Sequence, residues 1–251
     1  MATMRMPDLR READGLSARL TAWRRDLHAH PELGFAEHRT AGIVAQVLSG
    51  LGCEVRTGIG RTGVVGLLRG GLPGPTVMLR ADMDALPVQE ISDAPYVSVE
   101  PGKMHACGHD GHMAMALGAA SLLAQHAPEM PGQVLLLFQP AEECMDGARS
   151  MILDGALDNP RPAAAFGLHL WNTMPVGRVS AHSGPIMAAA DVLHITIHGR
   201  GGHGALPHEA VDAIAVSGQV LSALQTIVSR NVDPQETAVL TVGSVQAGSA
   251  H

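Results

Sequence analysis

The stretch Met104-His-Ala-Cys-Gly-His-Asp-Gly-His112 is dense in side chains that can bind a metal ion: His105, Cys107, His109 and His112. A glycine stands on each side of the His109-Asp110 pair, and glycine lets the backbone bring closely spaced side chains onto one ion. Thiolate and imidazole are ligands for borderline-soft divalent cations such as zinc. The apolar, alanine-rich run 113–123 that follows predicts a helix. The motif therefore indicates a metal site just before a helix.

Two later segments offer the further ligands that such a site needs. Gln139-Pro-Ala-Glu-Glu143 follows a short apolar run, 133–138, of the kind found in buried strands. Gly167-Leu-His169 lies near the end of a second such run, 163–170. Open α/β sheets bind ligands at the carboxyl ends of their strands, and a dinuclear hydrolytic site needs about four to six protein ligands. We therefore predict four metal ligands: Cys107, His109, Glu143 and His169.

Neighbouring carboxylates suit the supporting roles of a hydrolytic site. Glu142 fits a general base, because adjacent loop residues can point one to the metal and the other to the substrate. Asp82 and Asp84 stand two apart at a strand end and could orient ligating histidines. Each of these residue types is by itself more often structural, and only the grouping at three strand ends favours a site. A nucleophilic dyad of Cys107 with a histidine is a rival scheme, but it leaves the glutamate pair unexplained.

The pattern of helices and strands predicts the fold class. Helical spacing covers residues 16–30, 37–51 and 148–157, and strand-like runs cover residues 53–57, 63–69, 76–80, 133–138 and 163–170. This alternation predicts an α/β sandwich with a largely parallel sheet.

After Trp171 the pattern changes. Residues 192–198 alternate with the period of a half-exposed strand, 209–229 form an amphipathic helix, and 238–245 resemble a further strand. We interpret this as the beginning of a second, α+β domain and predict domains at 1–185 and 186–251.

Composition limits the class of protein. The chain has 251 residues, of which 46% are hydrophobic and 16% charged, as in folded proteins. Its formal charge of −7 and the lack of a basic run with interleaved aromatic residues argue against a nucleic-acid partner. The first 20 residues lack the apolar segment of a signal peptide, and no apolar stretch is long enough to cross a bilayer. Three cysteines make a disulfide framework improbable, so a cytoplasmic protein is expected.

The ordered motifs resemble those of the metal-dependent amidohydrolases, which include hippurate hydrolase, N-acyl-amino-acid amidohydrolases and the indole-3-acetyl-amino-acid hydrolases. The resemblance extends from about residue 20 to the end of the chain, and six segments carry it: 27–35, 80–87, 104–112, 139–143, 167–169 and 199–208. It implies a zinc-peptidase-like catalytic domain, with a mixed sheet sandwiched by helices, and an inserted α+β lid and dimerisation domain that is incomplete here.

The resemblance also implies the chemistry. By position, Cys107, His109, Glu143 and His169 would bind two divalent ions (Zn, Mn, Co or Ni), and Glu142 would be the general base that hydrolyses the amide bond of an N-acyl amino acid. In the lid, His203 would contact the substrate or its oxyanion. A full-length protein would form a homodimer through the lid.

Two departures from the family pattern leave alternatives open. The family's last ligand is a histidine in a C-terminal segment. This chain ends at Gly248-Ser-Ala-His251, which resembles a lid motif cut short, so His251 is not expected to be that ligand. Cys144 stands where the family commonly has glycine. The alternatives are a truncated, inactive remnant that binds metal or a partner, and a deacetylase or peptidase such as one acting on N-acetyl-diaminopimelate.

Overall fold

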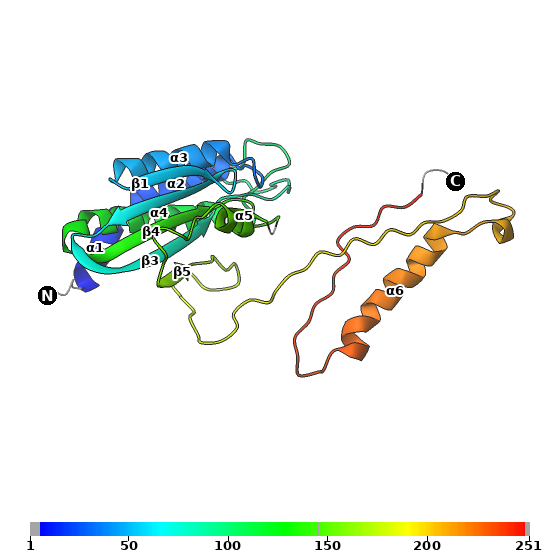
Figure 1. Cartoon of the computed structure of the whole chain (residues 1–251). Coiled ribbons are helices and arrows are strands. Elements are labelled where there is room, and N and C mark those ends of the chain that lie inside the picture. The colour runs from blue at the N-terminus through cyan, green and yellow to red at the C-terminus, as the bar shows by residue number, and fades with distance from the viewer. Residues whose placement is uncertain (1–5, 145, 249–251) are drawn as a thin grey trace. The chain divides into compact units, whose positions relative to one another are not determined.

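The computed structural model describes residues 6–144 and 146–248, which form two compact units divided after Arg178. Among the described residues, the first unit holds the sheet and five α-helices, and the second holds one long α-helix (Figure 1). Within the described residues, no helix combines the length and the apolar character that crossing a membrane requires. The predicted division into a catalytic domain, 1–185, and a lid, 186–251, assigns roles to these units and stays a prediction.

The sheet of the first unit has five strands in the order β1-β2-β4-β3-β5. Their bounds are Glu54–Ile59, Gly63–Arg69, Leu72–Asp82, Pro131–Gln139 and Ala164–Gly167 for β1 to β5. The β1–β2 and β2–β4 pairs are antiparallel, whereas β3 runs parallel to both β4 and β5. The predicted α/β class and mixed sheet are confirmed, but "largely parallel" is wrong for half of the pairings. For the β1–β2 pair the reason lies in the three-residue connection 60–62, because so short a link permits only an antiparallel pair.

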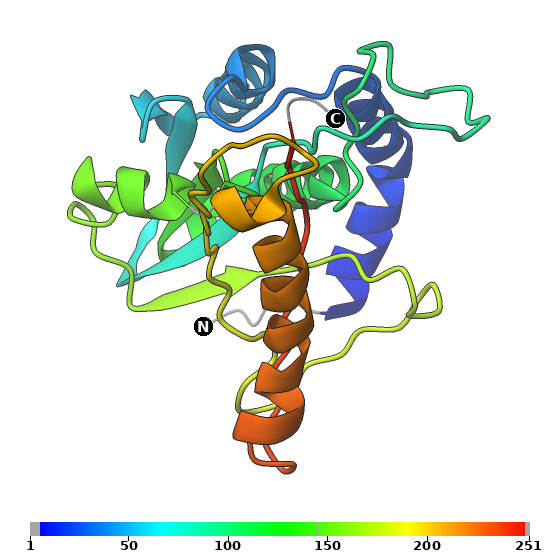
Figure 2. The same cartoon turned by 90° about the vertical axis from the view of Figure 1, so that its right-hand side faces the viewer.

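Period-two alternation along the central strands divides the core between the two faces of the sheet. On one face, Val64, Leu136 and Phe138 pack against three helices: α2 (Ser17–Ala29), α3 (His38–Gly50) and α4 (His109–Gln125). On the other face, Val65, Leu135 and Leu137 pack against α5, Gly147–Leu153. The turned view in Figure 2 shows the same helices around the sheet. Both faces of β2 and β4 are therefore covered, which explains why their sequences read as continuous apolar runs.

The predicted helices and the helices found agree within a few residues, with one addition. The first ten described residues form α1, Met6–Gly15, which the sequence analysis did not predict. The predicted helix 148–157 ends early, at Leu153. Element boundaries are the part of a sequence pattern that tertiary contacts decide, so differences of this size are expected.

The strand β5 departs from its prediction as a buried strand over 163–170. It covers only Ala164–Gly167, and all four residues are exposed. β5 pairs with β3 alone and lies at the edge of the sheet, and neither core cluster includes a residue from it. Its apolar sequence therefore indicates a strand correctly but not the burial of that strand.

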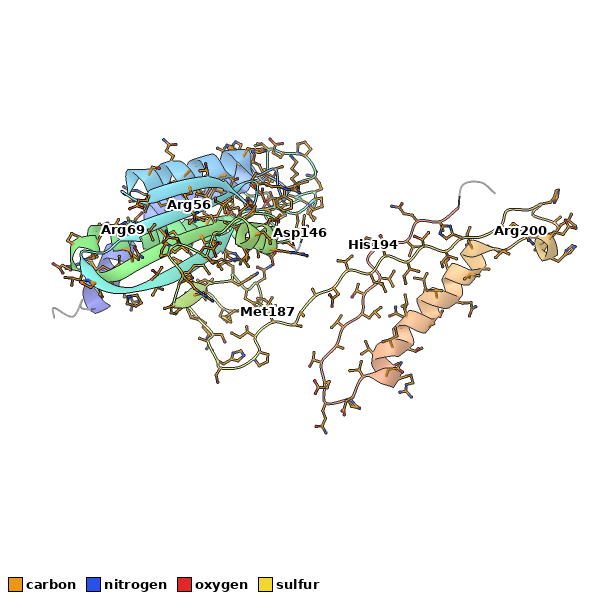
Figure 3. The ribbon with its side chains drawn as sticks, in the orientation of Figure 1. Arg56, Arg69, Asp146, Met187, His194 and Arg200 are labelled. Atoms are coloured by element: carbon orange, nitrogen blue, oxygen red, sulfur yellow. The ribbon has the colours of Figure 1, made fainter. Side chains whose placement is uncertain are left out.

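Up to residue 248, the second unit contains one α-helix, α6 (Ala213–Asn231), preceded by a short 3-10 turn at Pro207–Glu209. Asp212 caps α6, because its Oδ1 accepts hydrogen bonds from the backbone N–H groups of Ile214 and Ala215. The strands predicted at 192–198 and 238–245 are not formed. Alternating sequence makes a strand only where a neighbour completes the ladder, and the segment around His194 runs as extended chain (Figure 3).

Candidate metal centre

Glycine geometry places the central motif at the beginning of α4. Gly108 immediately precedes the helix with φ of +87°, a left-handed conformation that suits glycine. His109 is therefore the first helical residue, and Cys107 lies on the loop before it. This loop is tied to the sheet side of the site by backbone hydrogen bonds in both directions between Leu86 and Met104. The motif side chains are thus held at one end of α4, next to the sheet.

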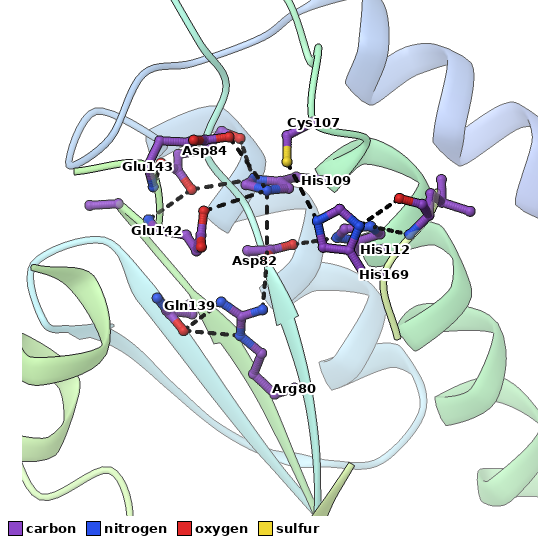
Figure 4. Close-up of polar contacts among 12 residues, drawn as sticks. Arg80, Asp82, Asp84, Cys107, His109, His112, Gln139, Glu142, Glu143 and His169 are labelled. Carbon is purple, nitrogen blue, oxygen red and sulfur yellow. Dashed lines mark hydrogen bonds and ion pairs between the residues drawn. The ribbon is translucent and has the colours of Figure 1, made fainter. Parts of the chain in front are cut away.

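The three parallel strands bring the other predicted ligands to the same place. β3 ends at Asp82, β4 ends three residues before Glu142, and β5 ends two residues before His169. Because parallel strands end at one edge of a sheet, these side chains meet beside the beginning of α4 (Figure 4).

One cluster fits a metal ion by both spacing and unpaired atoms. Cys107, His109 and Glu143 each offer a ligand atom, and these atoms lie within 4.8 Å of one another. His109 Nε2 and Glu143 Oε1 are 3.8 Å apart, and both are buried without a hydrogen-bond partner among the described residues. His109 Nδ1 donates to the carbonyl oxygen of Asp84 at 2.7 Å, so the lone pair on Nε2 faces the cluster. Buried polar atoms normally have partners, and a bound cation would supply one here.

His169 adjoins this cluster through the thiol. Its Nε2 lies 3.5 Å from Cys107 Sγ, and its Nδ1 donates to the carbonyl oxygen of Leu170. Cys107 therefore stands between His169 on one side and the His109–Glu143 pair on the other. The structure brings all four predicted ligands together around the Cys107 sulfur.

A second group also satisfies metal-ligand spacing, but two of its three residues, Asp82 and His112, already have hydrogen-bond partners. Asp82, His109 and His112 offer atoms within 4.8 Å of one another. However, His112 Nδ1 lies 2.7 Å from Asp82 Oδ1, and its Nε2 accepts the N–H of Leu170 at 2.9 Å. Arg80 donates to Asp82 Oδ2 at 2.6 Å. Although burial alone would raise the pKa of Asp82, these partners lower it to about 2. In this group Asp82 and His112 therefore form a hydrogen-bond network, and only His109 Nε2 is without a partner among the described residues.

The turn that carries the glutamate pair is held by two buried carboxylates. Asp84 Oδ1 accepts the N–H of Glu142 and Oδ2 accepts the N–H of Glu143, both at 3.0 Å. Glu37 Oε1 accepts the N–H of Ala141 at 2.8 Å, and Ala141 has φ of +48°. Three consecutive N–H groups thus point to carboxylates on other parts of the chain. These hydrogen bonds fix the backbone of residues 141–143, and so fix the Cα positions from which the side chains of Glu142 and Glu143 extend.

The electrostatics of the cluster favour a cation. Burial, followed by the charges of Glu143 and Glu142, raises the pKa of the Cys107 thiol to about 12. Burial also raises the pKa of Glu143. Burial and the neighbouring carboxylates both disfavour the negatively charged forms of these two groups. The thiol and the carboxyl therefore retain their protons unless a metal ion replaces them. The donor set of sulfur, nitrogen and oxygen therefore fits divalent cations.

A buried charge network fixes the beginning of α4 from the other side. Asp110 Oδ2 lies 2.6 Å from His28 Nδ1 and 2.8 Å from Arg24 Nε, both on α2. His28 Nε2 in turn lies 3.2 Å from Glu90 Oε1. The bond to Asp110 raises the pKa of His28. Because Asp110 follows His109 directly, this network holds α4 where its first side chain meets the cluster.

The three predicted supporting residues, Asp82, Asp84 and His203, have different contacts in the structure. Asp84 contacts His109 Nδ1 through its backbone carbonyl at 2.7 Å and through its Oδ1 at 3.4 Å, and its carboxylate also holds the glutamate turn. Asp82 bonds His112, while its Oδ2 is 3.6 Å from His109 Nε2. His203 lies in the second unit, where its Nδ1 accepts the N–H of Ala205, so its substrate role stays a prediction. His251 falls outside the described residues.

Two residues that matter here were missed from the sequence. Glu37 is fully buried and accepts hydrogen bonds from Ala141 and from the hydroxyl of Thr62. His112 was noted only as a side chain that can bind a metal ion, yet both of its ring nitrogens have hydrogen-bond partners in the protein. The only sequence signal for Glu37 was its place before a helix, which does not reveal a contact more than 100 residues away in sequence.

A mixed α/β sandwich with this ligand set at the carboxyl ends of its parallel strands defines a candidate metallohydrolase domain. Comparison with known proteins agrees: the model of peptidase family M20/M25/M40 matches residues 78–247. An N-acyl-L-amino acid amidohydrolase of Geobacillus stearothermophilus is 45% identical over 249 residues, which cover 99% of this chain and 67% of that protein. An N-acetyl-L-cysteine deacetylase of Bacillus subtilis is 45% identical over 234 residues, 93% of this chain and 56% of that protein.

A solved structure supports the same assignment. The B. subtilis protein YxeP, described as a dinuclear metal-binding peptidase from the M20 family, superposes with a TM-score of 0.67 at 37% identity, over 85% of this chain and 57% of that one. The chain belongs to peptidase family M20/M25/M40. The predicted resemblance is thereby confirmed. The chain spans about 60% of the length of several curated relatives that it matches.

Proposed function

We propose that this chain is the metal-binding part of a hydrolase that cleaves the amide bond of N-acyl amino acids. Cys107, His109, Glu143 and His169 would hold divalent cations, which when bound polarise an amide carbonyl and lower the pKa of a coordinated water. The observation that carries the proposal is the pair of buried, unpartnered atoms, His109 Nε2 and Glu143 Oε1, facing the Cys107 sulfur. Such a pair is costly in a folded protein unless a ligand satisfies it.

Glu142 is the proposed general base. Its Oε2 lies 3.8 Å from His109 Nε2, and its side chain is 40% exposed, so it reaches both the cluster and the solvent. In this position a carboxylate can take a proton from the attacking water and pass it to the leaving amine. Asp84 supports this division of roles, because it fixes the backbone of both glutamates and lets Glu143 turn inward while Glu142 remains open.

The rival scheme, with Cys107 as a nucleophile activated by His169, is less well supported. The two groups are 3.5 Å apart, as such a dyad would be. A nucleophilic thiol, however, needs a lowered pKa, and burial beside Glu143 raises the pKa of Cys107 to about 12. A thiol in this environment suits metal binding, where the cation displaces the proton.

The substrate class rests on the relatives. Those named above act, by name, on N-acyl amino acids and on N-acetylcysteine. We propose the same general class here, with residues 186–251 as part of a lid that would supply His203 to the substrate and would form the homodimer contact. Deacetylation of N-acetyl-diaminopimelate, or peptide cleavage, would change the acyl or amine group but not the roles of the cluster.

Separate variants of the two glutamates test the proposal. The chain is freed of metal with a chelator and then titrated with Mn²⁺ or Zn²⁺ by calorimetry, and hydrolysis of N-acetyl and N-benzoyl amino acids is followed. We expect Glu143→Ala to lose metal affinity, and Glu142→Ala to bind metal normally but lose nearly all turnover. Glu129→Ala, an exposed carboxylate outside the site, is the matched control. Normal turnover by Glu142→Ala would remove its role, and a wild-type chain that binds metal without turnover would favour the inactive remnant.

A further inference from the structure

His112 joins two segments that are distant in the sequence. It is 3% exposed and lies in the first turn of α4. A backbone N–H can only donate, so the 2.9 Å contact with Leu170 N makes His112 Nε2 an acceptor. The proton of the neutral ring is then on Nδ1, which donates to Asp82 Oδ1 at 2.7 Å. The two hydrogen bonds fix the ring in one tautomer and leave neither nitrogen available to a cation.

The Leu170 side chain makes a second contact with the same helix. A Cβ atom added at Gly111 would lie 2.5 Å from Leu170 Cδ1, and one added at Gly108 would lie 3.3 Å from it. Because Gly108 and Gly111 have no side chain, Leu170 can pack directly against the backbone at the beginning of α4. The motif glycines, which the sequence analysis assigned to the metal site, therefore also make room for Leu170, the residue after His169.

Few other described contacts hold this segment. The preceding strand β5 is four residues long, pairs only with β3 and is exposed throughout. Leu168 is 56% exposed and Trp171 is 52% exposed. The His112 bond and the packing on the two glycines are consequently the described contacts that tie His169 and Leu170 to α4. The rings of His112 and His169 meet edge to face, with centroids 4.6 Å apart.

The far end of this connection is anchored in the sheet. Asp82, the acceptor for His112, ends β3 and also accepts a hydrogen bond from Arg80 at 2.6 Å. Arg80 in turn donates from Nε and an NH₂ group to Gln139 Oε1, at 2.9 and 2.8 Å, where β4 ends. The ring of His112 is therefore held by hydrogen bonds that lead to the ends of β3 and β4. Through its bond to Leu170, it fixes the segment that follows β5 relative to those two strand ends.

We infer that His112 is a positioning residue for the metal centre. By holding the N–H of Leu170 against α4, it places the imidazole of His169 beside the Cys107 sulfur, and so sets the affinity of the cation position that His169 would serve. This inference rests on the proposed function. Residues that orient metal ligands in this way change affinity by about 10–100-fold when they are altered.

Two conservative variants separate the two hydrogen bonds. In His112→Asn the side-chain amide lies where Nδ1 was, so the bond to Asp82 can persist while the acceptor for Leu170 is lost. In His112→Gln the amide oxygen lies near the former Nε2, so the acceptor for Leu170 persists while the bond to Asp82 is weakened. Both variants keep a polar, uncharged side chain of similar size, so the pair controls for a purely structural loss.

The first readout is hydrogen exchange of the Leu170 amide in the metal-free chain, with the amide of Leu136 in the core as the reference. The second is titration with Co²⁺, in which the sulfur-to-cobalt absorption band reports Cys107 and the visible bands report the whole ligand set. We expect His112→Asn to accelerate exchange at Leu170 alone and to weaken Co²⁺ binding by about 10–100-fold. We expect His112→Gln to stay close to wild type in both.

The outcomes distinguish this inference from the proposed function. A wild-type chain that binds no Co²⁺ overturns the metal centre and the inference together. If the wild-type chain binds Co²⁺ but His112→Asn leaves exchange at Leu170 or metal affinity unchanged, the metal centre stands and the positioning role is wrong. Equal losses in both variants would also overturn the route through Leu170, because His112→Gln preserves that bond.

Discussion

The substitution Asp84→Asn tests how firmly the glutamate turn is held. Asp84 is 1% exposed, and its two oxygens accept the N–H groups of Glu142 and Glu143 at 3.0 Å each. Asparagine keeps one acceptor and presents an NH₂ group to the other N–H, so one charge-assisted hydrogen bond is lost and the second becomes neutral. The first loss costs about 1.5–3 kcal/mol and the second about 1 kcal/mol, which together lower the free energy of unfolding by about 2.5–4 kcal/mol.

Urea unfolding followed by tryptophan fluorescence measures this change. Both tryptophans, Trp23 and Trp171, belong to the first unit, so the signal reports the unit that contains Asp84. Asp93→Asn makes the same chemical change at an exposed position and should stay within about 0.5 kcal/mol of wild type. A loss below about 1 kcal/mol for Asp84→Asn, or a loss equal to that of Asp93→Asn, would refute the account of the turn.

Three further predictions concern the surroundings of the site. The hydrogen bond with Asp110 raises the pKa of His28, so it stabilises the fold fully below about pH 6.5 and less as pH rises through the raised value. The stability difference between wild type and His28→Gln in urea unfolding should therefore shrink as pH rises above about 6.5, and a constant difference would contradict this. Glu37→Gln can keep both hydrogen bonds of the buried carboxylate and should cost about 1 kcal/mol, whereas Glu37→Leu should cost about 3 kcal/mol or more by the same measurement. Gly111→Ala should displace Leu170 and weaken Co²⁺ binding, while Gly42→Ala, in an open place on α3, should leave binding unchanged and stabilise the helix by up to about 1 kcal/mol.

The sequence predicted the elements that converge on the site because their signals are local. The apolar run 133–138 and the Pro140 that follows it indicated a strand ending before Glu142, and β4 ends at Gln139. The motif glycines indicated a turn into a helix, and Gly108 has the left-handed backbone that glycine favours. Once the strands are parallel, the meeting of their carboxyl ends follows from geometry.

What the sequence could not supply were partners. Period-two alternation tells which residues share a face of a strand, but not which element covers that face. The predicted burial of β5 was therefore wrong, and the strands predicted at 192–198 and 238–245 do not form because no neighbouring strand among the described residues pairs with them. The same limit hid Glu37 and the acceptor role of His112, whose contacts join residues 104 and 58 positions apart. Contacts of this kind depend on the assembled sheet and leave no periodic trace in the chain.

The capture of three successive amides by Glu37 and Asp84 has a consequence for the thermodynamics of metal uptake. A loop that must become ordered around an ion spends part of the binding free energy on its own lost entropy. Here the backbone of residues 141–143 is already fixed by buried acceptors, so Glu143 has only its side-chain rotamers to lose. When metal binding is measured by calorimetry, the entropy of association should accordingly be dominated by the release of water and protons and not by ordering of the chain.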